Sequence, residues 1–349
     1  MIQVVIMAGG IGTRFWPLSR KRLAKQFLHI IDHKSLLEHT LDRLSGFVEN
    51  QNIWVVGNHD QSKHLKPLLQ SIPEDQVLLE PMGKNTAPCI GWAATELLKK
   101  DPDATMVVLP ADHFIKDIDS FQNTLRQAVE HVGTSHDLLT IGIQPTHPHT
   151  GYGYIEAQDT QSPLSSVKRF REKPGLEQAE LFLKTGGFYW NSGIFVWRAD
   201  TILDLIKTYL PHNHSVLQSI NSLKHDSDYQ NNLAACFEQF QNISIDYGIM
   251  EHAVEQTVVL KAGFDWSDVG NWNALDSFWE KDNQQNAVKG HYLGLNSNNN
   301  IIYSSKRLVS TINVSNFIII DSEDALLILP KSSDQEIRKL YEKLPDSHT

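Results

Sequence analysis

Short apolar runs alternate with longer amphipathic stretches through the first part of the chain. Five of these runs are continuous in apolar character and predict buried strands, at residues 2–7, 53–56, 77–79, 106–109 and 138–143. Between them, residues 35–47 and 87–100 carry apolar side chains at three- and four-residue spacing, which predicts helices. Strands of this kind, separated by helices, are typical of a parallel sheet covered on both faces. Such sheets bind ligands at the carboxyl ends of their strands, so a site is expected after Met7, Leu79 and Leu109.

The pattern changes in the middle of the chain and again towards its end. Residues 151–197 contain β-like pieces punctuated by glycine and proline, which predicts a mixed sheet that extends the core. Helical periodicity returns over residues 199–240. In the last part, asparagine-rich turns separate β-like runs at residues 301–303, 317–320 and 325–329, before a polar helix at residues 334–343.

The length of the chain supports a division into two parts. Its 349 residues exceed the roughly 250–300 that a single hydrophobic core usually supports. We therefore expect an α/β fold with a Rossmann-like sheet, mostly parallel or mixed and flanked by helices, in residues 1–281. Residues 282–349 are expected to form a small β-rich C-terminal domain with a terminal helix.

Charge and cysteine content exclude several classes of protein. Lys and Arg number 31 against 41 Asp and Glu, a formal net charge of −10, whereas a protein that coats nucleic acid normally carries a basic excess. The two cysteines, Cys89 and Cys236, are too few for a disulfide framework or a thiolate zinc cluster. No apolar stretch approaches the roughly 20 residues of a membrane helix, and the first residues do not read as a secretion signal. We expect a cytoplasmic protein that binds neither nucleic acid nor membranes.

A glycine-rich loop with the sequence Ala-Gly-Gly-Ile-Gly-Thr-Arg, residues 8–14, follows the first strand. Glycines allow backbone amides to approach an anion closely. The Walker A pattern is absent, and the dinucleotide fingerprint fails because Phe15 stands where a third glycine is required. Five cations lie within twelve residues: Arg14, Arg20, Lys21, Arg22 and Lys25. The glycines alone fit a strand exit beside a solvated basic face equally well, but glycines and cations together favour a phosphate-binding loop.

Two aspartates are candidate ligands for a hard cation. Asp112 follows the predicted strand at residues 106–109, and Asp268 lies in the sequence Trp-Ser-Asp-Val-Gly. Magnesium prefers oxygen ligands and is commonly bound by one or two carboxylates together with substrate phosphates. On spacing alone, a helix N-cap is the more favoured role for either aspartate. The neighbouring His113 is interpreted as a hydrogen-bonded structural residue and not as a metal ligand.

The glycine loop and the residues after it resemble the opening motif of the sugar-phosphate nucleotidylyltransferases. The resemblance covers Gly-Gly-Ile-Gly-Thr-Arg-Phe-Trp-Pro-Leu-Ser-Arg from residue 9 and Lys-Gln-Phe-Leu from residue 25, and the Lys-Gln-Phe variant is similar to mannose-1-phosphate guanylyltransferases in particular. Further similar segments follow in family order, at residues 80–88, 110–113, 151–156, 171–174, 190–195, 244–251 and 266–272. The tail after residue 282 resembles the small β-rich domain of the short, single-activity form of this enzyme.

This resemblance implies roles for particular residues. Nucleotide binding is implied for Ala8, Gly9, Gly10, Gly12, Thr13, Arg14, Glu80, Asn85, Thr86 and Asp112. Binding of the sugar phosphate is implied for Tyr152, Gly153, Glu172, Lys173, Asn191, Ser192 and Asp246. Catalytic roles are implied for Arg14, Lys25, Asp112 and Lys173, and a Mg²⁺ site is implied at Asp112 and Asp268.

Simpler interpretations of two of these segments remain open, and two positions depart from the family pattern. Asn85 and Thr86 are also candidate helix caps, and Glu172 with Lys173 is also a candidate surface charge pair. Ala24 stands where the family usually has proline, which predicts a looser loop. His252 stands where lysine is common, which predicts a weaker positive charge near neutral pH.

The reaction implied by the resemblance is transfer of GMP from GTP to mannose 1-phosphate, by metal-assisted in-line attack on the α-phosphorus. The partners implied are these two small molecules, with a homodimer as a candidate assembly. Alternatives are the same chemistry with another sugar 1-phosphate or nucleotide, or a non-catalytic relative that binds a nucleotide sugar. A nicotinamide-dependent dehydrogenase is disfavoured by Phe15.

Overall fold

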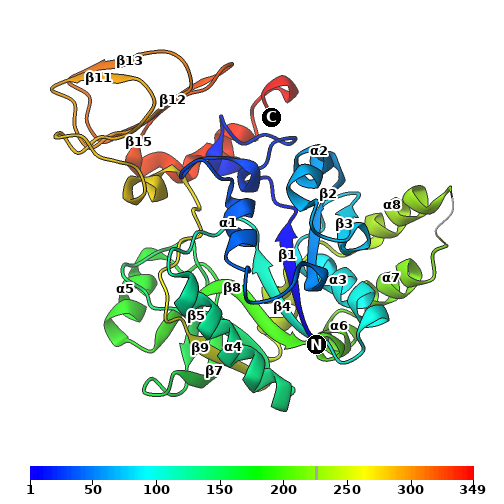
Figure 1. Cartoon of the computed structure of the whole chain (residues 1–349). Helices are drawn as coiled ribbons and strands as arrows, with labels where there is room; N and C mark the ends of the chain where they lie inside the picture. The colour runs from blue at the N-terminus through cyan, green and yellow to red at the C-terminus, as the bar shows by residue number, and fades with distance from the viewer. Residues whose placement is uncertain (225–226) are drawn as a thin grey trace.

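The computed structural model describes residues 1–224 and 227–349, and a nine-stranded sheet forms its centre (Figure 1). The strand order is β3-β2-β1-β4-β8-β5-β9-β7-β6. The strands are β1 Ile2–Ala8, β2 Ile53–Asn58, β3 Val77–Glu80, β4 Thr105–Pro110, β5 Leu138–Ile143, β6 Tyr154–Ala157, β7 Leu164–Arg171, β8 Phe188–Arg198 and β9 Thr257–Lys261. The α-helices are α1 Leu36–Asp42, α2 Ser62–Leu65, α3 Thr86–Lys100, α4 Ile118–Thr134, α5 Leu176–Thr185, α6 Ala199–Tyr209, α7 Pro211–Asn221, α8 Tyr229–Gln239 and α9 Ile337–Tyr341.

The first four strands of the sheet are parallel. β1 pairs with β2 on one side and β4 on the other, and β2 pairs with β3. β2 and β4 are buried along almost their whole length, which is why their sequences are continuous in apolar character. The carboxyl ends of β1, β3 and β4 therefore meet at one edge of the sheet, where Ala8, Glu80 and Pro110 end their strands.

The rest of the sheet is mixed, as the change of pattern after residue 150 predicted. The long strand β8 runs antiparallel to both β4 and β5, and β5 is parallel to β9. The register of β5 against β8 shifts between Thr140 and Gly142. Such irregularities re-aim side chains, and this one lies opposite Asn191 and its neighbours on β8.

Helices cover both faces of this sheet (Figure 1). On one face α3, α6, α7 and α8 pack through buried side chains such as Trp92, Ile202 and Phe237. On the other face α1, α4 and α5 pack through side chains such as Phe121 and Leu125. The predicted fold class, a Rossmann-like sheet flanked by helices and followed by a small β-rich region, is thereby confirmed.

The last part of the chain forms two small sheets. One has the order β10-β12-β14-β15 and the other pairs β11 with β13; the strands are β10 Ala287–Lys289, β11 Tyr292–Leu295, β12 Ile301–Ser304, β13 Val309–Ile312, β14 Phe317–Asp321 and β15 Leu326–Pro330. The pairs β10–β12, β12–β14 and β11–β13 are parallel, so the chain winds in coils that add one strand to each sheet in turn. Asn296, Asn299, Asn313 and Asn316 turn these coils with positive φ, which asparagine tolerates better than most residues. This explains the asparagine-rich turns of the sequence.

The small sheets and the C-terminal segment pack against the segment that follows the glycine loop (Figure 1). Phe15 and Trp16 share an apolar core with Trp272 and Ile318. The Trp16 indole donates a hydrogen bond to the His348 carbonyl at 2.9 Å. Residues of the C-terminal region thus pack against Phe15 and Trp16, which directly follow the glycine loop.

Some element boundaries differ from the sequence-based prediction. The helix predicted at residues 35–47 is the short α1, because the chain turns at Arg43 and reaches Gly46 with φ 79°. The periodic stretch 199–240 contains three helices, α6 to α8, because Pro211 starts a new one; residues 225–226 of that stretch lie outside the described residues. In place of one terminal helix, a 3₁₀ segment at Lys331–Glu336 precedes α9. Among the described residues, the helices are all too short or too polar to cross a membrane.

Candidate active site

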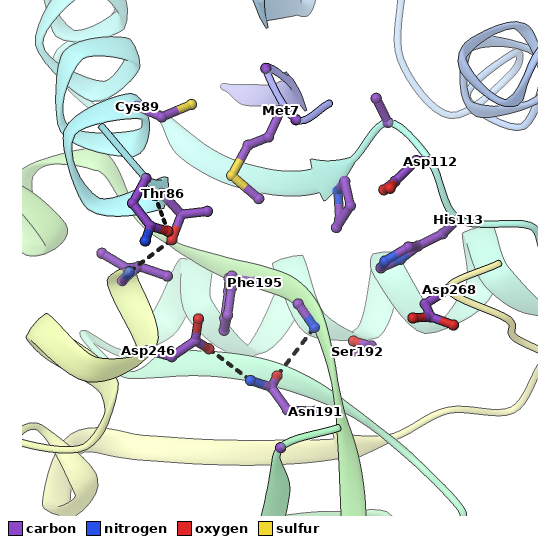
Figure 2. A pocket seen from close by; sticks show the side chains of 18 of the residues that line it. Met7, Thr86, Cys89, Asp112, His113, Asn191, Ser192, Phe195, Asp246 and Asp268 are labelled. Atoms are coloured by element: carbon purple, nitrogen blue, oxygen red, sulfur yellow. Dashed lines mark hydrogen bonds between the residues drawn. The ribbon is translucent and has the colours of Figure 1, made fainter. Parts of the chain in front are cut away.

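A cavity of about 600 Å³ opens at the carboxyl ends of β1, β3 and β4, where the sheet topology predicted a site (Figure 2). Gly9 and Gly10 after β1, Glu80 at the end of β3 and Asp112 after β4 line it. A nucleotide sugar requires a cavity of this size class. The side chains labelled in Figure 2 come from segments that are far apart in the sequence and point towards a common space.

Lys25 joins the two candidate metal ligands. Its Nζ donates to Asp112 Oδ2 at 2.9 Å and to the Asp268 carbonyl at 2.6 Å, and the residue is only 4% exposed. Burial raises the pKa of the Asp112 carboxyl, but the charge of Lys25 and its hydrogen bond outweigh burial, so the pKa lies below its ordinary value. Gly12 has φ 71°, and a Cβ there would stand 2.3 Å from Cβ of Lys25. Glycine at position 12 therefore makes room for this lysine.

The Asp268 carboxylate is held by two donors. Tyr152 donates its hydroxyl to Oδ1 at 2.6 Å, and the Gly270 amide donates to the same oxygen at 3.0 Å. Burial, and then the neighbouring charge of Asp268, raise the pKa of Tyr152, so its hydroxyl stays protonated and remains a donor. The aromatic ring of Tyr152 lines the cavity, and its hydroxyl orients Asp268.

Asp112 and Asp268 fit a hard cation that is also held by substrate oxygens. Neither is a helix N-cap, because Asp117 caps α4 and Asn271 caps the short helix that follows residue 268. Hydrogen bonds among the described residues use Asp112 Oδ2 and Asp268 Oδ1, which leaves one oxygen of each carboxylate for a ligand. The described residues contain no group of three or more His, Cys, Asp or Glu side chains suited to a metal. A two-carboxylate set matches the way magnesium is bound together with phosphates.

His113 has the environment of a structural residue. The Trp266 indole donates to His113 Nδ1 at 3.1 Å, so this nitrogen is an acceptor. Burial lowers the pKa of His113 to about 4, which keeps the ring neutral at physiological pH. The His113 side chain lies between Asp112 and Asp268 in Figure 2. His113 is therefore a hydrogen-bonded structural residue that also forms part of the cavity wall.

Glu80 and the start of α3 form one end of the cavity. Glu80 is 4% exposed, and its Oε1 has no hydrogen-bond partner among the described residues. Burial raises the pKa of its carboxyl to about 8. Asn85 caps α3 by accepting from the Thr86 amide at 2.9 Å, and Thr86 Oγ1 accepts from the Ile245 amide at 2.8 Å. The capping role left open by the sequence is therefore real, and both residues also line the cavity.

Asn191 and Asp246 lie at another end of the cavity, joined by a hydrogen bond (Figure 2). Asn191 donates from Nδ2 to Asp246 Oδ1 at 2.7 Å, and its Oδ1 accepts from the Gly193 amide at 3.2 Å. These contacts fix which end of the amide faces which neighbour. Burial raises the pKa of Asp246 to about 6. Ser192 lines the cavity, but its hydroxyl donates to the Ile141 carbonyl at 2.7 Å.

Glu172 and Lys173 line the cavity and form an ion pair with each other. The local charge pair suggested by the sequence is therefore present, at the edge of the cavity. A Cβ at Gly153 would stand 2.5 Å from Glu172 Oε2, so glycine there lets the carboxylate approach the backbone.

The structure brings together most of the candidate residues, but not all. Fourteen line the cavity: Gly9, Gly10, Glu80, Asn85, Thr86, Asp112, Tyr152, Gly153, Glu172, Lys173, Asn191, Ser192, Asp246 and Asp268. Five do not: Ala8, Gly12, Thr13, Arg14 and Lys25. Lys25 still acts on the site through Asp112. Of the other loop cations, Arg20 pairs with Asp324 and Lys21 with Asp346, away from the cavity.

Several residues that line the cavity are not among the candidates that the sequence indicated. Gln26 follows Lys25 in the motif, and its Nε2 donates to the Ala8 carbonyl at 2.6 Å, which fixes the end of β1. Cys89 lies three residues after Thr86 on α3, so helical spacing places it on the same face. Trp266 precedes Asp268 by two residues in a segment already singled out. In each case, the only indication in the sequence is the short spacing from a candidate site residue: Lys25, Thr86 or Asp268.

The two departures from the family pattern lie outside the cavity. Ala24 has φ −75°, which is within the range that proline would impose, so the loop keeps that conformation without the ring. His252 stacks on Tyr209 at a ring separation of 5.5 Å and does not line the cavity.

Comparisons with known proteins agree along the whole chain. A family model described as nucleotidyl transferase matches residues 3–285, and one described as MannoseP isomerase/GMP-like beta-helix domain matches residues 290–344. The mannose-1-phosphate guanylyltransferase of Klebsiella pneumoniae is 37% identical over 99% of this chain and 74% of the relative. The enzyme of the same name from Salmonella muenchen is 38% identical over 97% of this chain and 72% of the relative.

One solved structure superposes on nearly the entire chain. It is described as a mannose-1-phosphate geranyltransferase from Thermus thermophilus, with a TM-score of 0.88 and 31% sequence identity. The alignment covers 98% of each chain. The small sheets of the C-terminal region are therefore part of the shared fold.

Proposed function

We propose that this chain, which belongs to the nucleotidyl transferase family, transfers GMP from GTP to mannose 1-phosphate and forms GDP-mannose and pyrophosphate. Its activity is sugar-phosphate nucleotidyl transfer, which the family model and the relatives have in common. The nucleotide, the sugar and the metal are the parts of the function that we propose.

A single observation carries this proposal. One cavity is lined by Glu80 and Thr86 in one region, by Asp112 and Asp268 in a second, and by Asp246 in a third. Two phosphorylated substrates must meet for nucleotidyl transfer, and a base site, a cation site and a sugar site that share one cavity suit that requirement.

The environment of Glu80 supports guanine as the base. Guanine presents two donors on one edge, the N1–H and the exocyclic amine, whereas adenine presents an acceptor at N1. A buried carboxylate with an unpartnered oxygen is a suitable acceptor for those donors. Guanine therefore satisfies a polar group that is otherwise buried without a partner.

The other end of the cavity supports a sugar. Hydroxyl groups donate to carboxylates, and Glu172 and Asp246 offer carboxylate oxygens there. Asn191 is fixed by Asp246 and Gly193, which gives it a defined orientation before substrate binds. Lys173 is the cation that we propose for the sugar's phosphate.

The chemical difficulty of the reaction is repulsion between phosphates, and not activation of a nucleophile. The attacking oxygen of mannose 1-phosphate is already anionic, so no general base is needed. At about 4 Å, two unit charges repel by about 4 kcal/mol at an effective dielectric constant near 20. We propose that Arg14, Lys25 and Lys173 offset this repulsion, with Lys25 also holding Asp112 in place.

Asp112 and Asp268 are the residues that would hold a divalent metal, and we propose magnesium. When bound, this ion supplies positive charge that stabilises the phosphates and the departing pyrophosphate. Lys25 and Tyr152 orient the two carboxylates in advance, through the hydrogen bonds described above.

The decisive experiment is pyrophosphate release from GTP and mannose 1-phosphate, with and without Mg²⁺. We expect release that depends on both substrates and on the metal. The choice of base is tested by replacing GTP with ATP, UTP or dTTP. The choice of sugar is tested by replacing mannose 1-phosphate with glucose 1-phosphate. If another nucleotide and sugar phosphate release pyrophosphate faster, they replace GTP or mannose 1-phosphate as the proposed substrates. If the protein binds GDP-mannose but releases pyrophosphate from no pair, it is a non-catalytic relative.

We also propose a cytoplasmic homodimer. Leu293, Leu295 and Ile312 are exposed on β11 and β13 of the small sheets, which leaves apolar surface for a second copy. Size-exclusion chromatography with light scattering tests this part, and a monomer at micromolar concentration would contradict it.

A further inference from the structure

A buried arginine lies under the turn that presents Asp112. Arg43 ends α1 and is only 2% exposed. It forms no ion pair among the described residues, and its Nε has no hydrogen-bond partner there. Burying a guanidinium without a carboxylate partner costs free energy of folding, because the charge loses its hydration. Arg43 is therefore not explained by a contribution to stability alone. Its contacts point to another role.

Arg43 and Thr40 hold the backbone on both sides of Asp112. Arg43 Nη1 donates to the carbonyl of His113 at 2.8 Å. Arg43 Nη2 donates to Thr40 Oγ1 at 2.8 Å. The Thr40 hydroxyl lies 3.1 Å from the carbonyl of Ala111 and 3.0 Å from the carbonyl of Leu36, so its single proton is shared between these two acceptors. The residues immediately before and after Asp112 are therefore attached to the same helix end. The direction of the carboxylate follows from the direction of this turn.

The pair Arg43 and Thr40, called the clamp below, is itself supported from two sides. Gln122 of α4 donates to the Arg43 carbonyl at 3.0 Å, and the guanidinium lies over the Phe121 ring at 5.5 Å. Burial lowers the pKa of Arg43 to about 9, and the charge of Asp112 opposes that shift, so the guanidinium is charged at neutral pH.

We propose that Thr40 and Arg43 are positioning residues for the cation site: they clamp the turn at residues 111–113 and aim the Asp112 carboxylate into the cavity. Neither residue lines the cavity, and neither was indicated by a motif. The inference rests on the proposed function, because it gives Asp112 the role of a metal ligand.

The test compares three variants with one matched control. Arg43→Met removes the charge and both donors at similar length, Arg43→Lys keeps the charge, and Thr40→Val removes only the hydroxyl. Arg338→Met is the control, because Arg338 is exposed on α9, pairs with Glu342 and does not contact the turn.

Two measurements are made on the full-length protein, with thermal melting as a check of folding. The first is Mn²⁺ affinity by electron paramagnetic resonance, in protein alone and with GTP. The second is the division of steady-state effects between kcat and KM, with Mg²⁺. For Arg43→Met we expect Mn²⁺ affinity about tenfold weaker and kcat about 10–100-fold lower, with KM within about threefold of wild type. Arg43→Lys should restore part of both losses, Thr40→Val should show smaller losses, and the control should match wild type.

A variant that melts earlier but keeps wild-type Mn²⁺ affinity and kcat would overturn the proposal, because Arg43 would then serve stability only. If Arg43→Met does not fold, Arg43→Lys and Thr40→Val decide the question by the same two measurements. Failure of the proposed function looks different: wild-type protein would bind Mn²⁺ but release no pyrophosphate. The Mn²⁺ affinities of the variants still test the clamp in that case.

Discussion

At the scale of single residues, the candidate active site consists of buried charged and polar groups that hold one another. Lys25 holds Asp112, Tyr152 holds Asp268, and Asn191 holds Asp246. These pairs set directions of side chains before any substrate binds. Preorganised groups of this kind stabilise charge more effectively than mobile ones, because no reorganisation is needed during the reaction.

Asp112→Asn should lower kcat by at least about 100-fold, because it removes the negative charge that we propose for the cation while it keeps the shape of the side chain. Steady-state assays of pyrophosphate release measure the effect. Asp117→Asn is the control, since Asp117 only caps α4 and asparagine is an equally good cap. Near-normal turnover in Asp112→Asn would remove Asp112 from the mechanism.

The raised pKa of Glu80 leads us to expect that guanine binding depends on pH. Its carboxyl has a pKa of about 8 in the free protein because of burial, so it is mainly protonated at pH 7. Guanine donors require the ionised form, so affinity should rise by up to about tenfold per pH unit between pH 6 and 8, and then level off. Binding should lower this pKa and release a proton.

Calorimetric titration of GDP from pH 6 to 9 measures this dependence, and buffers of different ionisation enthalpy reveal the released proton. Glu80→Gln is the reference, because it keeps the size of the side chain and cannot ionise. It should bind GDP more weakly at pH 8 and lose most of the pH dependence. Equal pH profiles for the two proteins would show that Glu80 does not accept from the base.

At the scale of elements, the glycine loop depends on a segment more than 300 residues away. The Trp16 indole donates to the His348 carbonyl, and the Trp16 carbonyl accepts from the Trp272 indole at 3.2 Å. Arg20 and Lys21 reach Asp324 and Asp346 in the same region. Two of the cations that follow the glycine loop therefore attach this segment to the C-terminal region, which the sequence-based expectation of a phosphate-binding cation group did not foresee.

Trp16→Phe should lower the free energy of unfolding by about 1–3 kcal/mol and raise the KM for GTP, because the loop loses its hydrogen bond to the C-terminal segment. Chemical denaturation and steady-state kinetics measure the two effects. Trp54→Phe is the matched control: Trp54 is buried and donates to Gln3 Oε1 at 3.0 Å, far from the loop. It should lose similar stability with no change in KM. An unchanged KM in both variants would show that the C-terminal segment does not shape the loop.

At the scale of the whole molecule, a shared core joins the large sheet region to the small sheets. Phe15, Trp272 and Trp279 pack with Ile318 and Ile320 of β14. We still propose the division at residue 281, with a nucleotidyltransferase domain before it and the β-rich domain after it. Since the apolar core crosses that boundary, the two parts should unfold together.

Ile320→Ala should lower the free energy of unfolding by about 2–5 kcal/mol, because it leaves a cavity in this shared core. Urea denaturation followed by fluorescence and by circular dichroism should give one coincident transition. Ile328→Ala is the control, since Ile328 is 56% exposed on β15 and should change stability by less than about 0.5 kcal/mol. Two separate transitions would show that the parts fold independently.

Much of this molecule is determined by local sequence. Continuous apolar runs specify β1, β2, β4 and β5, because a strand buried on both faces has no place for polar side chains. The carboxyl ends of parallel strands meet at one edge, so the sequence alone predicts that Glu80 and Asp112 lie near one another. Asparagines at positive φ likewise account for the turns of the small sheets.

Tertiary structure alone decided which side chains act on which. Lys25 meets the Asp268 carbonyl across 243 residues, and Arg43 reaches the turn beside Asp112 from another helix. The raised pKa of Glu80 likewise depends on its burial, which no neighbour in the sequence indicates. Hydrogen bonds act over about 3 Å and burial depends on every surrounding element, so such properties exist only once the chain is packed.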